Sequence, residues 1–256
     1  NFDPVAIQFF SIEIRWYSLA YIVGILIGWT LGKRVLISDN ELKEKFDDYI
    51  TFVIIGIIVG GRLGFVFFYD LSYYLNNLVD IFKVWEGGMS FHGGLIGIIL
   101  ATMWFANKNY INPFRYLDVV SIVAPIGIFF GRIANFINSE LYGTKTDVPW
   151  AVKFIQIDQV SRHPSQLYEA IFEGIFLFII LLYFKNKGFL KSPGLVSGLF
   201  LIFYSIARFT IEFFRVPDEQ LGYLLFDLTM GQIISFFFLL IGCYLTIVKY
   251  GTRTES

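Results

Sequence analysis

The residues of this chain that could carry out chemistry are charged side chains and one histidine inside otherwise apolar stretches. His92 lies in GGMSFHGGLIG, Arg132 in GRIANFINSELYG, and Arg208 with Glu212 in RFTIEFFR. A charged residue in a membrane-spanning segment is costly and is therefore a candidate functional residue. Arginine binds anions such as phosphate through paired hydrogen bonds, and a neutral imidazole accepts a proton. These residues predict a site that binds an anion and deprotonates a nucleophile.

Each of these positions also has a purely structural interpretation. Arg208 and Glu212 are four residues apart, so they could form an ion pair that only neutralises itself. Arg132 and Asn135 share a helix face and could join neighbouring helices, and an arginine near a helix end can reach the membrane interface. We favour function for the whole set because we expect the arginines and the histidine to outnumber the carboxylates at their depth.

No other catalytic pattern is evident in the sequence. It has no Gly-x-Ser-x-Gly motif and no His/Cys cluster for a metal, and Cys243 lies in the apolar run LLIGCYL, where we interpret it as packing. The runs GGRLG and FHGG are not P-loops, because no Gly-Lys-Ser/Thr follows them. We therefore expect no cofactor and no metal. A net charge of −1 argues against a nucleic-acid partner.

The elements that must position these residues are membrane spans. The chain has 256 residues, of which 56% are hydrophobic and 16% charged, whereas soluble domains have about 25% charged residues. Crossing a bilayer takes about 20 apolar residues in a helix. We predict an all-α integral membrane protein, a compact bundle of about seven transmembrane helices forming a single polytopic domain over residues 1–256. The expected spans are 16–35, 49–69, 88–107, 117–138, 166–184, 194–214 and 223–248.

Positive charges indicate the orientation of these spans. Eleven of the twenty Lys and Arg residues follow the first, third, fifth and seventh spans: Lys33, Arg34, Lys43, Lys45, Lys108, Arg115, Lys185, Lys187, Lys191, Lys249 and Arg253. The positive-inside rule makes that side cytoplasmic, with the N-terminus outside and the C-terminus inside. His92, Arg132 and Arg208 are then expected toward the outer leaflet. The first span does not have the pattern of a removable signal peptide.

Three further features are expected from local patterns. Residues 139–165 predict a small extracytoplasmic segment with a strand-like run, WAVKFIQI. The sequence His-Pro-Ser at 163–165 is typical of a helix start, with Ser165 as the cap. Glycines recurring four residues apart, as at Gly56, Gly60 and Gly64, predict closely packed helices. Together the residues indicate an enzyme that binds a phospholipid head group and brings in a second substrate.

Six sequence blocks carry a family resemblance and run through nearly the whole chain: RWYSLAYIVG at 15–24, GGRLGFVFFYD at 60–70, VWEGGMSFHGGLIG at 84–97, GRIANFINSELYG at 131–143, RHPSQLYEA at 162–170 and GLFLIFYSIARFTIEFFRVPDEQLG at 198–222. In these blocks the chain resembles the prolipoprotein diacylglyceryl transferase family. The fourth block matches the family signature, except that Ala134 stands where the family usually has Gly. The segment 139–165 is short for the family.

The resemblance implies a transferase of bacterial lipoprotein maturation. Such an enzyme moves the sn-1,2-diacylglyceryl group from phosphatidylglycerol to the lipobox cysteine thiol of a prolipoprotein, forms a thioether and releases glycerol 1-phosphate. Its expected partners are phosphatidylglycerol, the prolipoprotein signal peptide with its lipobox cysteine, and membrane lipid. The family works at the outer face of the bacterial cytoplasmic (inner) membrane.

The resemblance also implies roles for particular residues. The lipid phosphate is expected on Arg132 and Arg208, and the residues implied to bind phosphatidylglycerol are Arg132, Asn135, Glu140, Gly143, Arg208 and Glu212. The residues implied in catalysis are Tyr17, His92, Arg132 and Arg208. Glu212 is expected to support Arg208.

Two other classes of protein remain open from the residues alone. A transporter or flippase would carry an anionic lipid or solute, but many transporters show inverted repeats and polar residues near the midplane. This sequence has no evident repeat, and its polar residues fall in one half of the spans. A structural or receptor-like seven-helix protein would leave the clustered arginines unexplained.

Overall fold

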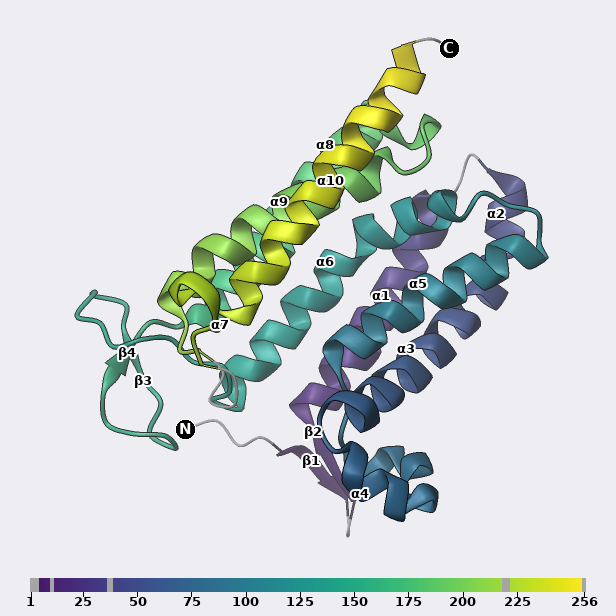
Figure 1. Ribbon diagram of the computed structural model, residues 1–256. Coiled ribbons are helices and arrows are strands. Elements are labelled where there is room, and N and C mark those ends of the chain that lie inside the picture. Colours follow the sequence, from purple (N-terminus) through teal and green to yellow (C-terminus); the bar gives the residue numbers. More distant parts are fainter. Residues whose placement is uncertain (1–4, 10–11, 36–38, 218–221, 255–256) are drawn as a thin grey trace. The chain divides into compact units, whose positions relative to one another are not determined.

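The computed structural model describes residues 5–9, 12–35, 39–217 and 222–254, and within these ranges the chain is mainly helical (Figure 1). The helices are α1 (Trp16–Val35), α2 (Asn40–Glu44), α3 (Phe46–Phe68), α4 (Leu71–Asn76), α5 (Phe91–Lys108), α6 (Pro113–Ile137), α7 (Ser165–Glu169), α8 (Leu177–Asn186), α9 (Leu195–Ile211) and α10 (Met230–Thr254). The strands are β1 (Val5–Phe9), β2 (Ile12–Arg15), β3 (Val152–Lys153) and β4 (Ser161–Arg162).

Six helical segments of the described chain are long and apolar enough to cross a membrane: Trp16–Val35, Phe46–Phe68, Pro113–Ile137, Ser165–Asn186, Leu195–Phe214 and Met230–Gly251. The all-α membrane class predicted from the sequence is confirmed, and the protein is a multi-pass membrane protein. The remaining expected span corresponds to α5, which has 18 residues. Its first turn carries His92, Gly93 and Gly94, and its last residues are Asn107 and Lys108. Its mean hydropathy is therefore lower than that of the six segments above.

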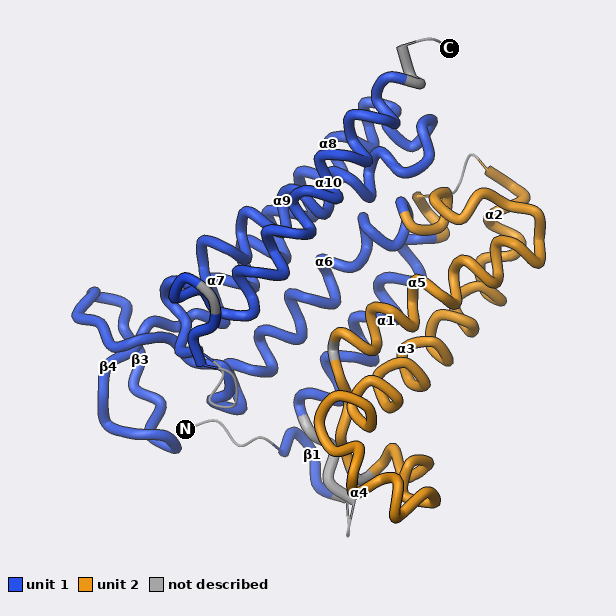
Figure 2. Tube along the Cα trace, viewed as in Figure 1, with its two compact units in different colours: residues 1–32, 118–256 blue, residues 33–117 orange. Residues whose placement is uncertain are grey.

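The chain divides into two compact units (Figure 2). Unit 1 comprises residues 1–32 and 118–256, and unit 2 comprises residues 33–117. The boundaries fall inside α1 and α6, so two spanning helices belong to both units. The single polytopic domain expected from the sequence stays a prediction.

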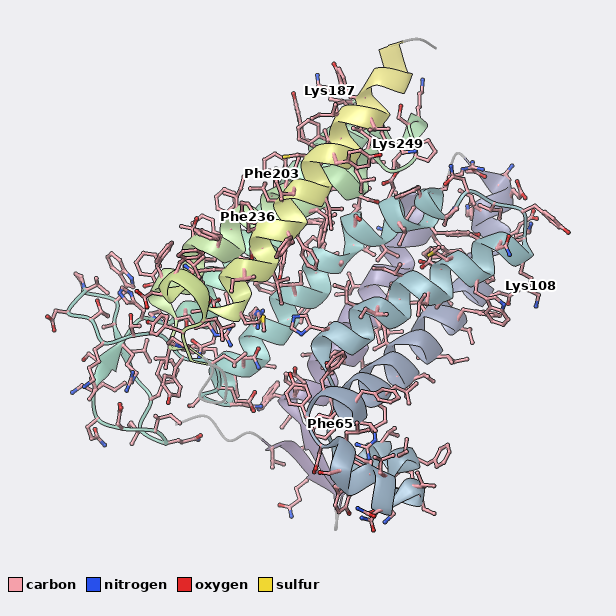
Figure 3. All side chains as sticks on the ribbon, in the orientation of Figure 1. Phe65, Lys108, Lys187, Phe203, Phe236 and Lys249 are labelled. Atoms are coloured by element: carbon pink, nitrogen blue, oxygen red, sulfur yellow. The ribbon has the colours of Figure 1, made fainter. Side chains whose placement is uncertain are left out.

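In unit 1, α9 packs along α10 at a point where two glycines meet. A Cβ on Gly198 would lie 3.1 Å from the Gly242 carbonyl oxygen, and a Cβ on Gly242 would lie 2.8 Å from that of Gly198. Small residues allow such close approach of helices in a membrane, where packing replaces the hydrophobic effect. Figure 3 shows Lys187 and Lys249 near one end of this helix group, with Phe203 and Phe236 along its length.

In unit 2, α3 packs on α5 through the glycines that the sequence singled out. A Cβ on Gly60 would lie 2.4 Å from the Gly93 carbonyl oxygen, and one on Gly64 would lie 2.7 Å from Gly93 Cα. The prediction of close packing at these glycines is confirmed. Ser90 caps α5 by accepting a hydrogen bond from Gly93 N, and this cap places His92 in the first turn.

The segment before α7 folds back on itself through short strand pairs. β3 pairs antiparallel with β4, and Gly143 forms an isolated bridge with Arg215. The strand expected at WAVKFIQI is present but only two residues long, Val152–Lys153. The helix start expected at 163–165 is confirmed, since α7 begins at Ser165. The capping role predicted for Ser165 is wrong, because its hydroxyl donates to the Leu141 carbonyl instead.

Candidate functional site

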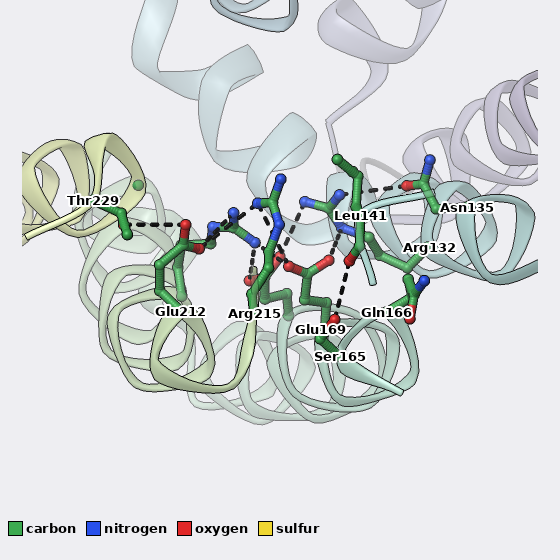
Figure 4. Close-up of polar contacts among 12 residues, drawn as sticks. Arg132, Asn135, Leu141, Ser165, Gln166, Glu169, Glu212, Arg215 and Thr229 are labelled. Carbon is green, nitrogen blue, oxygen red and sulfur yellow. Dashed lines mark hydrogen bonds and ion pairs between the residues drawn. The ribbon is translucent and has the colours of Figure 1, made fainter. Parts of the chain in front are cut away.

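Six charged side chains of unit 1 meet in one largely buried cluster, which we call the charged cluster. Figure 4 shows four of them with labels, Arg132, Glu169, Glu212 and Arg215. Its cations are Arg132 on α6, Arg208 on α9 and Arg215 just after α9. Its anions are Glu169, Glu173 and Glu212, from the α7–α8 span and from the turn after α9. Each member forms an ion pair with at least one other member, as described below.

Glu169 is the centre of the charged cluster. One carboxylate oxygen, Oε2, lies 2.9 Å from Arg132 Nε, and the other, Oε1, pairs with Arg208 Nη1. Arg215 Nη1 lies 4.0 Å from the same Oε1. One glutamate therefore joins α7 to α6, to α9 and to the segment that follows α9.

Glu173 lies one turn further along the same span and is held less closely. Its Oε1 is 3.6 Å from Arg208 Nη1, and its Oε2 is 3.7 Å from Arg132 Nη2. Both distances exceed those of N–H···O hydrogen bonds, which are about 2.7–3.2 Å. Neither oxygen accepts a hydrogen bond from the described residues. Glu173 is thus neutralised by two arginines at a distance, without direct hydrogen bonds.

The third glutamate of the charged cluster, Glu212, directly follows α9 and contacts residues at the start of α10. Its Oε2 lies 2.7 Å from Arg208 Nη2 and 3.7 Å from Arg215 Nη1, and its Oε1 accepts a hydrogen bond from Thr229 Oγ1 at 3.1 Å. A Cβ on Gly231 would lie 2.8 Å from the Glu212 carboxyl carbon. The ion pair of Arg208 with Glu212 expected from the sequence is confirmed. This ion pair is part of a larger network and does not only neutralise itself, because Arg208 also binds Glu169.

The local backbone explains how two glutamates come to share one helix face. Residues 165–186 form a single span, and its middle, Ala170–Phe176, is a π-helix between α7 and α8. Glu169 and Glu173 are four residues apart, a spacing at which like charges repel each other in a helix. A Cβ on Gly174 would lie 2.8 Å from Phe129 Cβ, so the π-helix packs closely on α6. Such π segments occur frequently at functional sites.

Burial separates the charged cluster into two layers. The side chains of Glu169 and Glu173 are completely covered, whereas those of Arg132 and Arg208 keep 18% and 10% of their surface exposed. Arg215 and Glu212 are intermediate, with 7% and 5% of their side-chain surface exposed.

The polar residues after Arg132 extend from the charged cluster. Arg132 Nη1 donates to Asn135 Oδ1 at 3.4 Å, and Asn135 Nδ2 donates to Glu140 Oε2 at 3.0 Å. Gln166 Nε2 donates to the Glu140 carbonyl oxygen at 2.6 Å. The structure therefore brings together five residues that the sequence singled out: Arg132, Asn135, Glu140, Arg208 and Glu212.

Gly143 has a clear structural reason to be glycine. A Cβ there would lie 2.3 Å from the His163 carbonyl oxygen and 2.7 Å from that of Phe214. Gly143 N also donates to the His163 carbonyl at 3.0 Å. The residue holds three chain segments together next to Arg215, and its role in lipid binding stays a prediction.

Tyr17 and His92 are the two remaining residues that the sequence singled out for catalysis. The Tyr17 hydroxyl lies 3.2 Å from the Tyr21 hydroxyl on α1, with the two rings edge to face. His92 belongs to unit 2 and is exposed at the start of α5. The predictions that both act near the reacting centre stay predictions.

Arg62 on α3, another membrane arginine, is fully engaged with backbone. Its Nε donates to the Ile81 carbonyl at 2.8 Å, and its Nη atoms donate to the carbonyls of Asp80, Gly87 and Gly88. The guanidinium also stacks over the Tyr74 ring. Arg62 therefore holds the loop that leads into α5.

The sequence interpretation recognised Glu212 as a partner of Arg208 but missed the pairing of Glu169 and Glu173 with the arginines. We expected cations to outnumber carboxylates, and this was wrong for the charged cluster, in which three arginines face three glutamates. The signal that could have revealed them is the pair of acidic residues four apart in the apolar run LYEAIFEGIF. Such residues are rarely left unpaired in a membrane.

The fold and this site define a multi-pass membrane protein with a buried cluster in which three arginines pair with three glutamates. A family model described as prolipoprotein diacylglyceryl transferase matches residues 4–248. The chain belongs to the prolipoprotein diacylglyceryl transferase family.

Curated relatives match at high identity over nearly the whole chain. A protein of Rickettsia felis, named phosphatidylglycerol–prolipoprotein diacylglyceryl transferase, is 51% identical, with 96% of each chain covered. A protein of the same name from Rhodopseudomonas palustris is 48% identical, covering 97% of this chain and 90% of its own. One from Rickettsia canadensis is 49% identical, over 94% and 95% of the two chains. These names agree with the transferase class implied by the sequence blocks.

Proposed function

We propose that this protein transfers the diacylglyceryl group of phosphatidylglycerol to the lipobox cysteine thiol of a prolipoprotein. Membership of the family supports the transferase activity. One observation carries the site assignment: Arg132 and Arg208, from two different helices, converge on Glu169, and each arginine side chain keeps part of its surface exposed. Arginine suits a phosphodiester because its planar donors match pairs of phosphate oxygens.

The proposed reaction is a displacement at carbon. The cysteine thiol loses its proton, and the thiolate attacks the glyceryl carbon that carries the phosphate ester. A carbon–sulfur bond forms while the carbon–oxygen bond breaks, and the electron pair of that bond goes to the phosphate oxygen. The products are the thioether-linked prolipoprotein and glycerol 1-phosphate.

The two arginines serve this step by stabilising the departing phosphate. The phosphate gains negative charge as the carbon–oxygen bond breaks, so guanidinium groups bind it more strongly in the transition state than in the bound substrate. Asn135 and Glu140 orient Arg132 through the hydrogen bonds described above, and Glu212 orients Arg208. Gly143 holds the segment that carries Glu140 next to Arg215.

His92 is the proposed base for the thiol, and Tyr17 is proposed to lie beside the reacting atoms. A neutral imidazole can accept a proton, and histidine is the side chain that most often acts as a general base. Turnover of a His92→Gln variant over a range of pH tests this role. Near-normal turnover with an unchanged pH profile would contradict it.

The site is proposed to open toward the outer leaflet of the bacterial inner membrane, with the N-terminus outside and the C-terminus in the cytoplasm. The charges that follow the odd-numbered spans support this orientation. Cysteine residues introduced at Asn138 and at Lys187, labelled with an impermeant reagent on intact cells, test it. Labelling at Lys187 but not at Asn138 would reverse the orientation and contradict the proposal.

The experiment that tests the function uses the purified protein in detergent micelles with phosphatidylglycerol and a lipobox peptide. The expected products are a thioether-linked peptide and free glycerol phosphate in equal amounts. A peptide with serine in place of the lipobox cysteine is the matched control and should remain unmodified. Movement of phosphatidylglycerol across a vesicle membrane without any thioether would favour the transporter interpretation instead.

A further inference from the structure

The six described members of the charged cluster carry opposite charges in equal number. Three arginines face three glutamates, so these six side chains sum to zero when all are ionised. A phosphodiester head group carries one negative charge. Its arrival without compensation would leave a net negative charge in a region where water is largely excluded, and a buried uncompensated charge is strongly unfavourable.

The arriving anion meets the arginines before it meets the glutamates. Arg132 and Arg208 keep part of their surface exposed, whereas Glu169 and Glu173 are covered. The phosphate would therefore share with Glu173 the two guanidinium groups that now neutralise it. Each guanidinium that turns toward the phosphate weakens its attraction to the carboxylate behind it.

Glu173 is the least firmly held of the three carboxylates. Glu169 has one contact with Arg132 at 2.9 Å and another with Arg208, and Glu212 has Arg208 at 2.7 Å and the Thr229 hydroxyl. Glu173 has no arginine nitrogen closer than 3.6 Å and no hydrogen bond from the described residues. Losing its charge therefore disrupts the fewest contacts.

The groups that face Glu173 come from three elements. These are Arg132 on α6, Arg208 and Tyr204 on α9, and Glu169 on α7. Complete burial of the Glu173 side chain disfavours its charged form, and Glu169 repels it as well, whereas the two arginines attract the carboxylate. A bound phosphate adds a second opposing negative charge. The equilibrium between the protonated and ionised forms of Glu173 thus depends on whether an anion occupies the site.

We propose that binding of an anionic lipid head group at the charged cluster is coupled to the uptake of one proton by Glu173, which keeps the cluster neutral. This inference rests on the proposed function, because it takes phosphatidylglycerol as the ligand. Glu173 acts as a positioning residue here, since it touches the two arginines and not the substrate. Release of the lipid returns the proton.

The first test measures protons directly. Phosphatidylglycerol is titrated into the purified protein by calorimetry, without peptide, in buffers of different ionisation enthalpy. The expected result is an uptake approaching one proton per bound lipid over the pH range in which Glu173 titrates. Across that range the affinity should fall about tenfold for each unit that the pH rises.

The second test uses a Glu173→Gln variant, which carries the neutral form at every pH. It should bind phosphatidylglycerol with an affinity that no longer depends on pH in that range and without proton uptake. A His163→Gln variant is the matched control, because His163 titrates outside the charged cluster, and it should keep the uptake. Difference infrared spectra give a readout that does not use variant stability. The protein with its natural Glu173 should gain a protonated carboxyl band when lipid binds.

The outcomes separate this inference from the proposed function. Binding of phosphatidylglycerol with no proton uptake, or uptake that persists in Glu173→Gln, overturns the inference and leaves the transferase activity untouched. Thioether formation on the same preparation tests that activity independently. A complete lack of lipid binding and of thioether formation overturns both.

Discussion

Glu169 on α7 pairs with Arg132 on α6 and with Arg208 on α9, so one covered carboxylate joins the two arginines proposed to bind the lipid phosphate. The distance between the guanidinium groups is therefore set by a side chain that lies behind them. An enzyme that must stabilise a developing charge benefits from donors that are fixed before the reaction. The glutamate thus has both a structural and an electrostatic role.

Replacing Glu169 by glutamine should strongly destabilise the protein. The substitution keeps the size of the side chain but leaves two buried arginines without their shared counterion, a loss that typically costs about 3–5 kcal/mol. Thermal or denaturant unfolding in micelles measures the effect. Glu41→Gln is the matched control, because Glu41 pairs with Lys45 at the surface, where an ion pair contributes about 0–1 kcal/mol. Equal effects of the two substitutions would contradict the central role of Glu169.

Arg208→Lys should abolish most of the transferase activity although it keeps the positive charge. Arg208 contacts Glu169 through Nη1 and Glu212 through Nη2, and a single ammonium group cannot reproduce both contacts together with a phosphate contact. We expect kcat to fall about 100-fold or more, as for loss of one oxyanion donor. The thioether assay measures this. Arg115→Lys is the control. Arg115 belongs to the other unit and pairs with Asp39, so this variant should remain fully active.

The glycines at 143 and 131 should respond differently to alanine. A Cβ on Gly143 would lie 2.3 Å from the His163 carbonyl oxygen, whereas one on Gly131 would have nothing within 4 Å. Overpacking of this kind costs about 1–3 kcal/mol, and Gly143→Ala should therefore lower both stability and activity. Gly131→Ala should fold normally and gain slightly in stability, because alanine is a better helix former. A stable and active Gly143→Ala would show that the neighbouring carbonyls can move apart.

Arg62→Met should loosen the loop that leads to His92. Arg62 donates to four backbone carbonyls, and each buried carbonyl left without a donor costs about 1–3 kcal/mol. Hydrogen exchange of residues 80–90 should rise, while exchange in α9, in the other unit, should stay the same. Arg62→Lys should give an intermediate result, because lysine can reach only some of these carbonyls. Unchanged exchange in the loop would refute the role assigned to Arg62.

The stability of the protein should depend on pH through His163. Burial lowers the pKa of His163 below its usual 6.5, so the folded state binds this proton less readily than the unfolded chain. The neutral imidazole contributes stability that is fully present above pH 6.5 and is lost as the pH falls through the folded pKa. The melting temperature should therefore fall more in the protein with His163 than in His163→Gln when the pH is lowered from 7. Parallel melting curves for the two proteins would contradict the prediction.

Much of the fold was predictable because membrane spans are local features. Runs of about 20 apolar residues mark a spanning helix whatever surrounds them, and the six spans found in the structure lie where such runs occur. The close packing of Gly60 against Gly93 was also predictable from the spacing of glycines. α5 was harder to assign as a membrane span. It is a helix, but His92 at its start and the polar residues at its end make its composition less apolar.

The sequence by itself determined the membrane class and the apolar spans, and it singled out the arginines inside them, because each depends on the identity of residues close together in the chain. Only the tertiary structure decided which carboxylates meet those arginines. Glu169 and Glu173 lie 37 and 41 positions after Arg132, and they reach it because α6 and the π-helical span pack side by side through Gly174. A charge in a membrane is stabilised by whichever partner the folded helices bring to it, and that partner depends on packing between helices.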